Sequence, residues 1–127
     1  MNANEHELDK IVHNVMGAAF EVANILGCGF LEKVYEHALV KELALRGLRT
    51  RPQVAFPVHY KNELIGEYFA DLVVEDQLVV ELKCADRLSN EHMAQCIDYL
   101  RASRLTLALL INFQHPKLEW KRIVYNP

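Results

Sequence analysis

The sequence predicts an α/β fold in which helices flank a mixed β-sheet. Residues 8–23 and 31–43 place apolar side chains at helical spacing. Residues 54–83 instead show the alternation and β-branched content of strands. Residues 105–111 form a nearly continuous apolar run, which is typical of a strand in the middle of a covered sheet. The expected order is helix, helix, three strands, helix, then one or two strands.

The first expected helix runs to the break at Gly27-Cys28-Gly29. A second helix follows and stops at Gly47, because glycine is common just past a helix end. Its buried side is expected to carry five apolar residues, with Tyr35 near the border: Leu31, Val34, Ala38, Leu39 and Leu43.

Pro52 and Pro57 indicate that the strand at 54–60 lies at a sheet edge, since proline cannot donate to a ladder. Residues 61–63 then form a turn, and strands at 64–74 and 78–83 follow. A third helix begins at Ser89 or Asn90 and runs to about residue 102, with Met93, Ile97 and Leu100 facing inward. Strands at 105–111 and 120–125 complete the predicted sheet.

Length and composition predict one soluble domain over residues 1–127. The chain is 51% hydrophobic and 24% charged, which is ordinary for a globular protein. No apolar run reaches the ~18 residues of a membrane span, and the first residues lack signal-peptide features. The three scattered cysteines fit a reducing compartment. We therefore expect a cytoplasmic protein without a membrane partner.

The net charge of −3 is unusual for a dedicated nucleic-acid binder, although carboxylates in a metal site would add to the acidic total. Two basic clusters, at residues 46–51 and 117–122, are interpreted as solvated surface charge. Cys84, His92 and Cys96 leave a zinc site conceivable, but buried thiols beside a surface histidine are the favoured interpretation.

The hairpin at residues 71–83 carries the strongest functional signal. If Glu75-Asp76-Gln77 is its loop, Asp71 falls opposite Glu81. Two facing carboxylates repel, and burial among valines and leucines increases that cost unless a cation lies between them. Lys83 lies two residues beyond Glu81 and so projects from the same face.

Magnesium prefers oxygen ligands, and one or two protein carboxylates commonly hold it together with water and substrate phosphate. Such an ion activates water and stabilises charge on phosphate. Asp71, Glu81 and Lys83 therefore predict a divalent-metal site for phosphate chemistry. The structural alternative is an Asp71–Lys83 ion pair at a strand end, with Glu81 exposed.

Two helix faces could supplement this site. Glu32, Tyr35 and Glu36 share one face of the second helix, from which Glu32 could reach a cleft at the sheet edge. On the third helix, Gln95 and Tyr99 are four residues apart and could hold a substrate phosphate or orient Lys83. Each set, taken alone, is also compatible with surface residues.

The stretch Gly29-Phe30-Leu31-Glu32-Lys33-Val34-Tyr35 matches the G-x-x-E-x-x-Y signature, and the chain resembles the GxxExxY protein family. The resemblance continues through residues 16–22, 70–74, 80–83 and 109–113. That family is grouped with the PD-(D/E)xK nuclease-like superfamily, whose restriction-endonuclease-like core has the helix and strand order predicted above.

The resemblance implies roles for the residues of these motifs. Asp71 and Glu81 would bind metal with help from Glu32, and these three with Lys83 would be catalytic. Gln95 and Tyr99 look like the Q-x-x-x-Y helix element of RecB-type exonucleases and would bind substrate, as would Tyr35.

Three functions stay open at this point, the third being a small-molecule metallohydrolase, because a metal and two carboxylates do not specify the substrate. The leading one is a Mg²⁺- or Mn²⁺-dependent hydrolase of nuclease type acting on DNA or, second, on RNA. The alternative is a non-catalytic nuclease-like module that binds nucleic acid or protein, or that forms a homodimer. The small size and acidic balance favour the module.

Overall fold

The structure, a computed structural model, describes residues 3–126 and contains three α-helices and five β-strands in the predicted order. The boundaries agree with the predicted ones to within a few residues in the strands and later helices. In chain order the elements are α1 (Ala3–Leu26), α2 (Glu32–Leu45), β1 (Thr50–Tyr60), β2 (Glu63–Val74), β3 (Leu78–Lys83), α3 (Asn90–Ser103), β4 (Leu107–Asn112) and β5 (Glu119–Val124).

The five strands form one sheet in the order β1-β2-β3-β4-β5. Only the β3–β4 pair is parallel, and α3 provides the crossover that a parallel pair requires. The other pairs are antiparallel, so the sheet is mixed as predicted. The edge position of β1 confirms what Pro52 and Pro57 indicated. Ser89 caps α3, since its hydroxyl accepts a hydrogen bond from the His92 amide.

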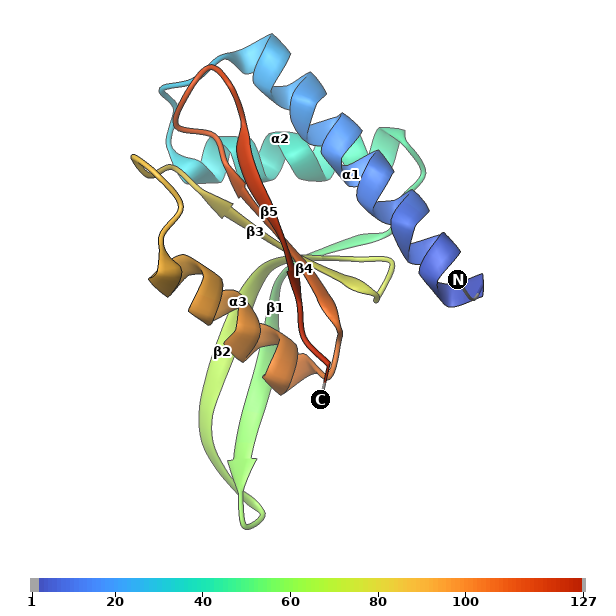
Figure 1. Cartoon of the computed structure of the whole chain (residues 1–127), viewed down its shortest axis with the longest axis vertical. Coiled ribbons are helices and arrows are strands. Elements are labelled where there is room, and N and C mark those ends of the chain that lie inside the picture. The colour runs from blue at the N-terminus through green and yellow to red at the C-terminus, as the bar shows by residue number, and fades with distance from the viewer. Residues whose placement is uncertain (1–2, 127) are drawn as a thin grey trace.

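Helices cover both faces of the sheet (Figure 1). Apolar residues of α1 and α2 pack on one face against side chains such as Leu72, Val80 and Leu109. On the other face, Cys96, Tyr99 and Leu100 of α3 form a smaller cluster with neighbouring strands. Every residue of β4 is buried, which confirms the prediction of a central covered strand.

The β1–β2 hairpin extends beyond the layered part of the molecule, as Figure 1 shows. Its distal residues 57–68, here called the hairpin arm, are nearly all exposed. The turn at the tip places Lys61 and Asn62 in the left-handed region, with φ of 47° and 69°. Within residues 3–126, none of the helices combines the length and apolar character that a bilayer crossing requires.

The buried side of α2 differs from the prediction. Leu31 is 80% exposed and Val34 is 38% exposed, whereas Tyr35 and Glu36 are buried. The Tyr35 hydroxyl explains the difference, because it donates to the Gly27 carbonyl at 2.7 Å and accepts from the Phe30 amide at 3.2 Å. These bonds satisfy backbone groups of the turn between α1 and α2 and draw Tyr35 inward.

The Tyr35 ring also stacks on Phe113, with centroids 4.7 Å apart. We expect Tyr35→Phe to lower the free energy of unfolding by about 1–3 kcal/mol, because it removes both hydrogen bonds that the Tyr35 hydroxyl makes to the backbone of the turn. Urea unfolding followed by circular dichroism would measure the loss. Tyr60→Phe is the matched control, since Tyr60 is 61% exposed on the hairpin arm. Equal stability of the two variants would contradict this role of the hydroxyl.

Candidate active site

Asp71 and Glu81 face each other where the β2–β3 ladder ends. The last paired residues are Leu72 and Val80, and Asp71 and Glu81 follow directly in the same register. Instead of a backbone bond, the Asp71 amide donates to Glu81 Oε1 at 2.8 Å. The Leu82 amide donates to Asp71 Oδ2 at 2.9 Å. Each carboxylate therefore accepts a hydrogen bond from a backbone amide of the opposite strand, and these two bonds hold the acids close together.

The neighbouring strand β1 also separates from β2 at Asp71. Its pairing with β2 passes from Pro52–Leu72 to Val54–Ala70 and omits Gln53 and Asp71. Gln53 has a left-handed φ of 50°, which is strained for a residue with a side chain. Asp71 consequently lies at an irregularity in the sheet, outside the regular residue pairing with both adjacent strands.

Burial and mutual repulsion dominate the electrostatics of the acid pair. Glu81 is only 2% exposed, and burial first, then the charge of Asp71, raises its pKa to about 9. Burial also raises the pKa of Asp71, while its hydrogen bond from Leu82 acts in the opposite direction. The alternative of an exposed Glu81 beside an Asp71–Lys83 ion pair is wrong, because Glu81 is buried and Lys83 contacts a different residue.

Lys83 is oriented by α3. Its Nζ donates to Gln95 Oε1 at 3.0 Å, as expected if Gln95 orients Lys83. Tyr99, one turn further along α3, is 4% exposed. The pKa of its hydroxyl is raised by burial first and then by the charges of Glu81 and Asp71. Gln95 therefore contacts Lys83 directly, and Tyr99 follows it by one turn on the same helix.

Two acids of α2 approach the site from the other side. Glu32 is exposed, and its Oε2 accepts from the Cys84 amide at 3.2 Å, which ties α2 to the residue after Lys83. Glu36 is buried and accepts from Gln53 Nε2 at 2.6 Å and from Lys33 Nζ at 2.9 Å. Both charges raise the pKa of Asp71, and that of Glu36 does so more strongly.

Glu36 was not among the predicted site residues, because apolar Leu31 and Val34 indicated a different buried side for α2. Tyr35, which is expected to bind substrate, is fully buried, and its hydroxyl donates to the Gly27 carbonyl. A second unpredicted residue is Asn112, which is buried at the end of β4 and bonds both the amide and the carbonyl of Ala85. It thereby fixes the loop that follows Lys83.

The donor set fits a small divalent cation in part. A cavity of about 20 Å³, room for roughly one water-sized occupant, is lined by Glu32, Lys33, Glu36, Asp71 and Leu82. Within residues 3–126, no group of three or more acidic, histidine or cysteine side chains is arranged to hold a metal, so Asp71, Glu81 and Glu32 do not converge as a trio. Asp71 and Glu81 remain as a pair of hard oxygen donors, which suffices for magnesium with water and phosphate.

The other charged and thiol groups take the predicted structural roles. Arg46, Arg49 and Arg51 pair with Glu42, Glu75 and Asp76, as solvated surface charges do. Cys96 is buried, and burial raises its pKa to about 12. The His92 ring accepts from the Ser89 amide as part of the helix cap. These contacts leave Cys84, His92 and Cys96 without the geometry of a zinc site.

A mixed sheet between helices, with two acids and a lysine on adjacent strands, defines a nuclease-like α/β protein. A family model described as the PD-(D/E)XK nuclease superfamily matches residues 9–123. The chain belongs to this superfamily, and the predicted fold class is confirmed. Divalent metals and nucleic acids are the general cofactors and substrates of such nucleases.

Among solved structures, the crystal structure of SSO0001 is similar in fold, with a TM-score of 0.58 and 14% sequence identity. The similarity covers 75% of this chain and 50% of that one, so the present chain spans half the length of SSO0001. At this identity the likeness shows the fold alone. No curated protein matches the sequence.

The raised pKa of Glu81 predicts how stability depends on pH in the metal-free protein. Between pH 4.5 and about 9, the folded state holds a proton that the unfolded state has released, so stability falls as pH rises. Glu81→Gln keeps the acceptor for the Asp71 amide and removes the titration. We expect this variant to be more stable than wild type by about 1–3 kcal/mol at pH 7, and by less near pH 5.

Thermal unfolding with a chelator present, over pH 5 to about 8, would measure this difference. Glu67→Gln on the exposed hairpin arm is the control for loss of one negative charge. A destabilised Glu81→Gln protein, or one with the wild-type pH slope, would contradict the electrostatic account of the pair.

Proposed function

We propose that this protein is a Mg²⁺- or Mn²⁺-dependent phosphodiesterase of nuclease type, acting on DNA or, second, on RNA. The observation that carries the proposal is the pairing of buried Glu81 with half-buried Asp71, together with Lys83, which Gln95 orients. Burying two adjacent carboxylates is costly for structure alone. Superfamily membership supports phosphodiester chemistry for the same residues.

In this proposal Asp71 and Glu81 hold the metal, with Glu32 at the rim of the adjacent cavity. A divalent ion bound there lowers the pKa of water and stabilises negative charge on phosphate. The backbone amides of Asp71 and Leu82 fix one oxygen of each carboxylate, which orients the other oxygen of each group. The acid pair is therefore positioned before substrate arrives, and little reorganisation is needed.

Lys83 acts on the hydrolytic water and on the phosphate. One of its three N–H bonds is used by Gln95, and the other two can be directed at a phosphate oxygen and at the attacking water. In the reaction, a water oxygen bonds to phosphorus and releases a proton to solvent, while the bond to the leaving oxygen breaks and that oxygen takes up a proton from solvent. Gln95 is a positioning residue, and Tyr99, one turn further along α3, would contact the substrate.

The match of residues 29–35 to the G-x-x-E-x-x-Y signature supports placing the chain in the GxxExxY branch. In that motif Glu32 bonds the Cys84 amide and Tyr35 holds the preceding turn, so the glutamate and tyrosine have different structural tasks. The alternative function is a non-catalytic binding module. Measurements of cleavage and of metal binding distinguish it from a nuclease.

Lys83→Ala is expected to lower metal-dependent cleavage of linear or single-stranded DNA by at least about 100-fold, because it removes the charge that contacts water and phosphate. Gel analysis of labelled DNA with Mg²⁺ or Mn²⁺ would measure cleavage. Gln95→Ala should give a smaller loss, since it frees Lys83 without removing it. Lys41→Ala, on the exposed side of α2, is the control. Absence of cleavage of any nucleic acid by the wild type would overturn the enzyme proposal.

Asp71→Asn is expected to weaken Mn²⁺ binding by about 10-fold or more, because the amide removes one of two carboxylate ligands. Isothermal titration calorimetry would measure the affinity, and Glu67→Gln controls for loss of a remote carboxylate. Wild-type protein that binds no Mn²⁺ but self-associates tightly would favour the interaction module.

A further inference from the structure

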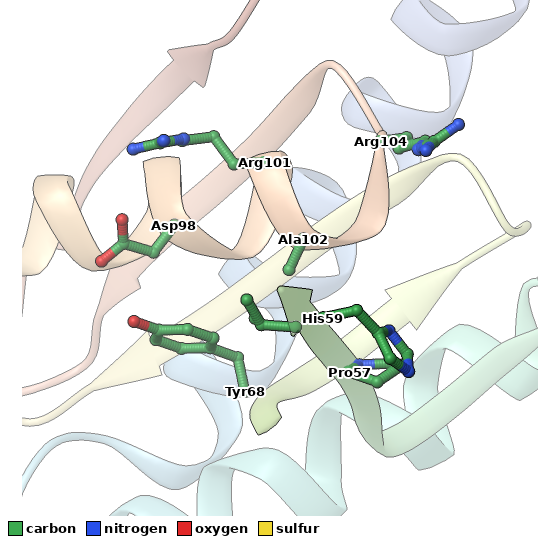
Figure 2. A pocket seen from close by; sticks show the side chains of 8 residues that line it. Pro57, His59, Tyr68, Asp98, Arg101, Ala102 and Arg104 are labelled. Carbon is green, nitrogen blue, oxygen red and sulfur yellow. The ribbon is translucent and has the colours of Figure 1, made fainter. Parts of the chain in front are cut away.

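A groove separates the hairpin arm from the C-terminal half of α3 (Figure 2). Its volume is about 630 Å³, within the range of sites that bind small molecules or single nucleotides. His59 and Tyr68 line it from the arm, and Asp98, Arg101 and Arg104 line it from the helix and its end. None of these residues belongs to the site described above.

The groove gathers unpaired positive charge. Of the seven arginines in the sequence, four form ion pairs with carboxylates: Arg46, Arg49, Arg51 and Arg122. Among residues 3–126, Arg101 and Arg104 make no side-chain hydrogen bond or ion pair, and both line the groove. Asp98 is the one acidic residue among the described lining residues. In a chain with net charge −3, this local basic excess indicates an anionic ligand.

An aromatic contact connects the groove to the acid pair. Tyr68 is 37% exposed, and its ring meets that of Tyr99 edge to face with centroids 5.7 Å apart. Tyr99 in turn lies one helical turn beyond Gln95, whose side chain accepts the hydrogen bond from Lys83. The groove is thus a continuation of the candidate active site along α3, with Tyr68 at the junction.

We propose that this groove binds the single-stranded nucleic acid that leads to or from the scissile phosphate. Arg101 and Arg104 contact backbone phosphates, the His59 imidazole supplies a further N–H donor, and Tyr68 stacks on a base. The inference rests on the proposed function, because it assigns to the groove the flanking strand of the same substrate.

A single strand fits these features better than a duplex. Stacking on Tyr68 needs an unstacked base face, which paired bases do not present. A groove with a basic wall and an aromatic side chain is the usual arrangement for single-strand binding without sequence preference. Arg104, which ends α3 in a left-handed conformation, would extend the phosphate contacts beyond the helix.

Binding can be measured without cleavage by fluorescence anisotropy of a labelled oligothymidylate of about twelve nucleotides, with a chelator present. Tyr68→Leu is expected to weaken binding by about 5- to 100-fold, and Tyr68→Phe, which keeps the ring, should bind as wild type. Arg101→Gln should weaken binding and reduce the salt dependence of log K by about 0.7. Asp98→Asn should strengthen binding, because it removes the acid from the groove.

Arg122→Gln is the matched control for the arginine change, since Arg122 pairs with Asp9 of α1 on the opposite face. No oligonucleotide binding, or equal binding by wild type, Arg101→Gln and Tyr68→Leu, would overturn the inference. A duplex of the same length that binds as tightly, with the same losses in the variants, would overturn the single-strand assignment. Because the chelator removes metal ions, the binding assay does not depend on cleavage. The proposed function would be overturned by a different result, the absence of metal-dependent cleavage by the wild type.

Discussion

The pairing of half-buried Asp71 with buried Glu81 is the interaction to which the surrounding structure is adapted. Two carboxyls in an apolar layer oppose folding unless hydrogen bonds, a proton or a cation compensate them. Here backbone amides of Asp71 and Leu82 bind the carboxylate oxygens, and burial leaves Glu81 with a pKa of about 9. Buried hydrophobic clusters on both faces of the sheet supply the stability that offsets this cost.

Several departures from regular structure surround this pair. Gln53 adopts a left-handed conformation opposite Asp71, and its side chain bonds the buried Glu36 of α2. Tyr35 closes the turn before α2 through two backbone hydrogen bonds, which turns Glu36 toward the sheet. Strain and buried charge gathered at one point are characteristic of functional sites, where neighbouring contacts hold unfavourable geometries in place.

The two faces of the sheet contribute different chemistry. From α2 come the acids Glu32 and Glu36, which border the small cavity beside Asp71. From α3 come Gln95, which orients Lys83, and Tyr99, which links the acids to the groove under the hairpin arm. Negative charge is therefore concentrated at the ion-sized cavity, and unpaired arginines lie along the groove. This separation suits a substrate whose phosphates must be held near, but not against, buried carboxylates.

Four features could be predicted from the sequence alone: the element order, the edge position of β1, the covered strand β4 and the opposition of Asp71 and Glu81. These follow from local periodicity, from proline chemistry and from a three-residue hairpin loop, which together set the register. The buried side of α2 could not be predicted, because contacts with the rest of the fold bury Tyr35 and Glu36 and leave Leu31 and Val34 exposed. The groove was likewise decided by folding, since it joins residues near 59, 68 and 101. Such contacts depend on hydrogen bonds and packing between distant segments, which no local pattern encodes.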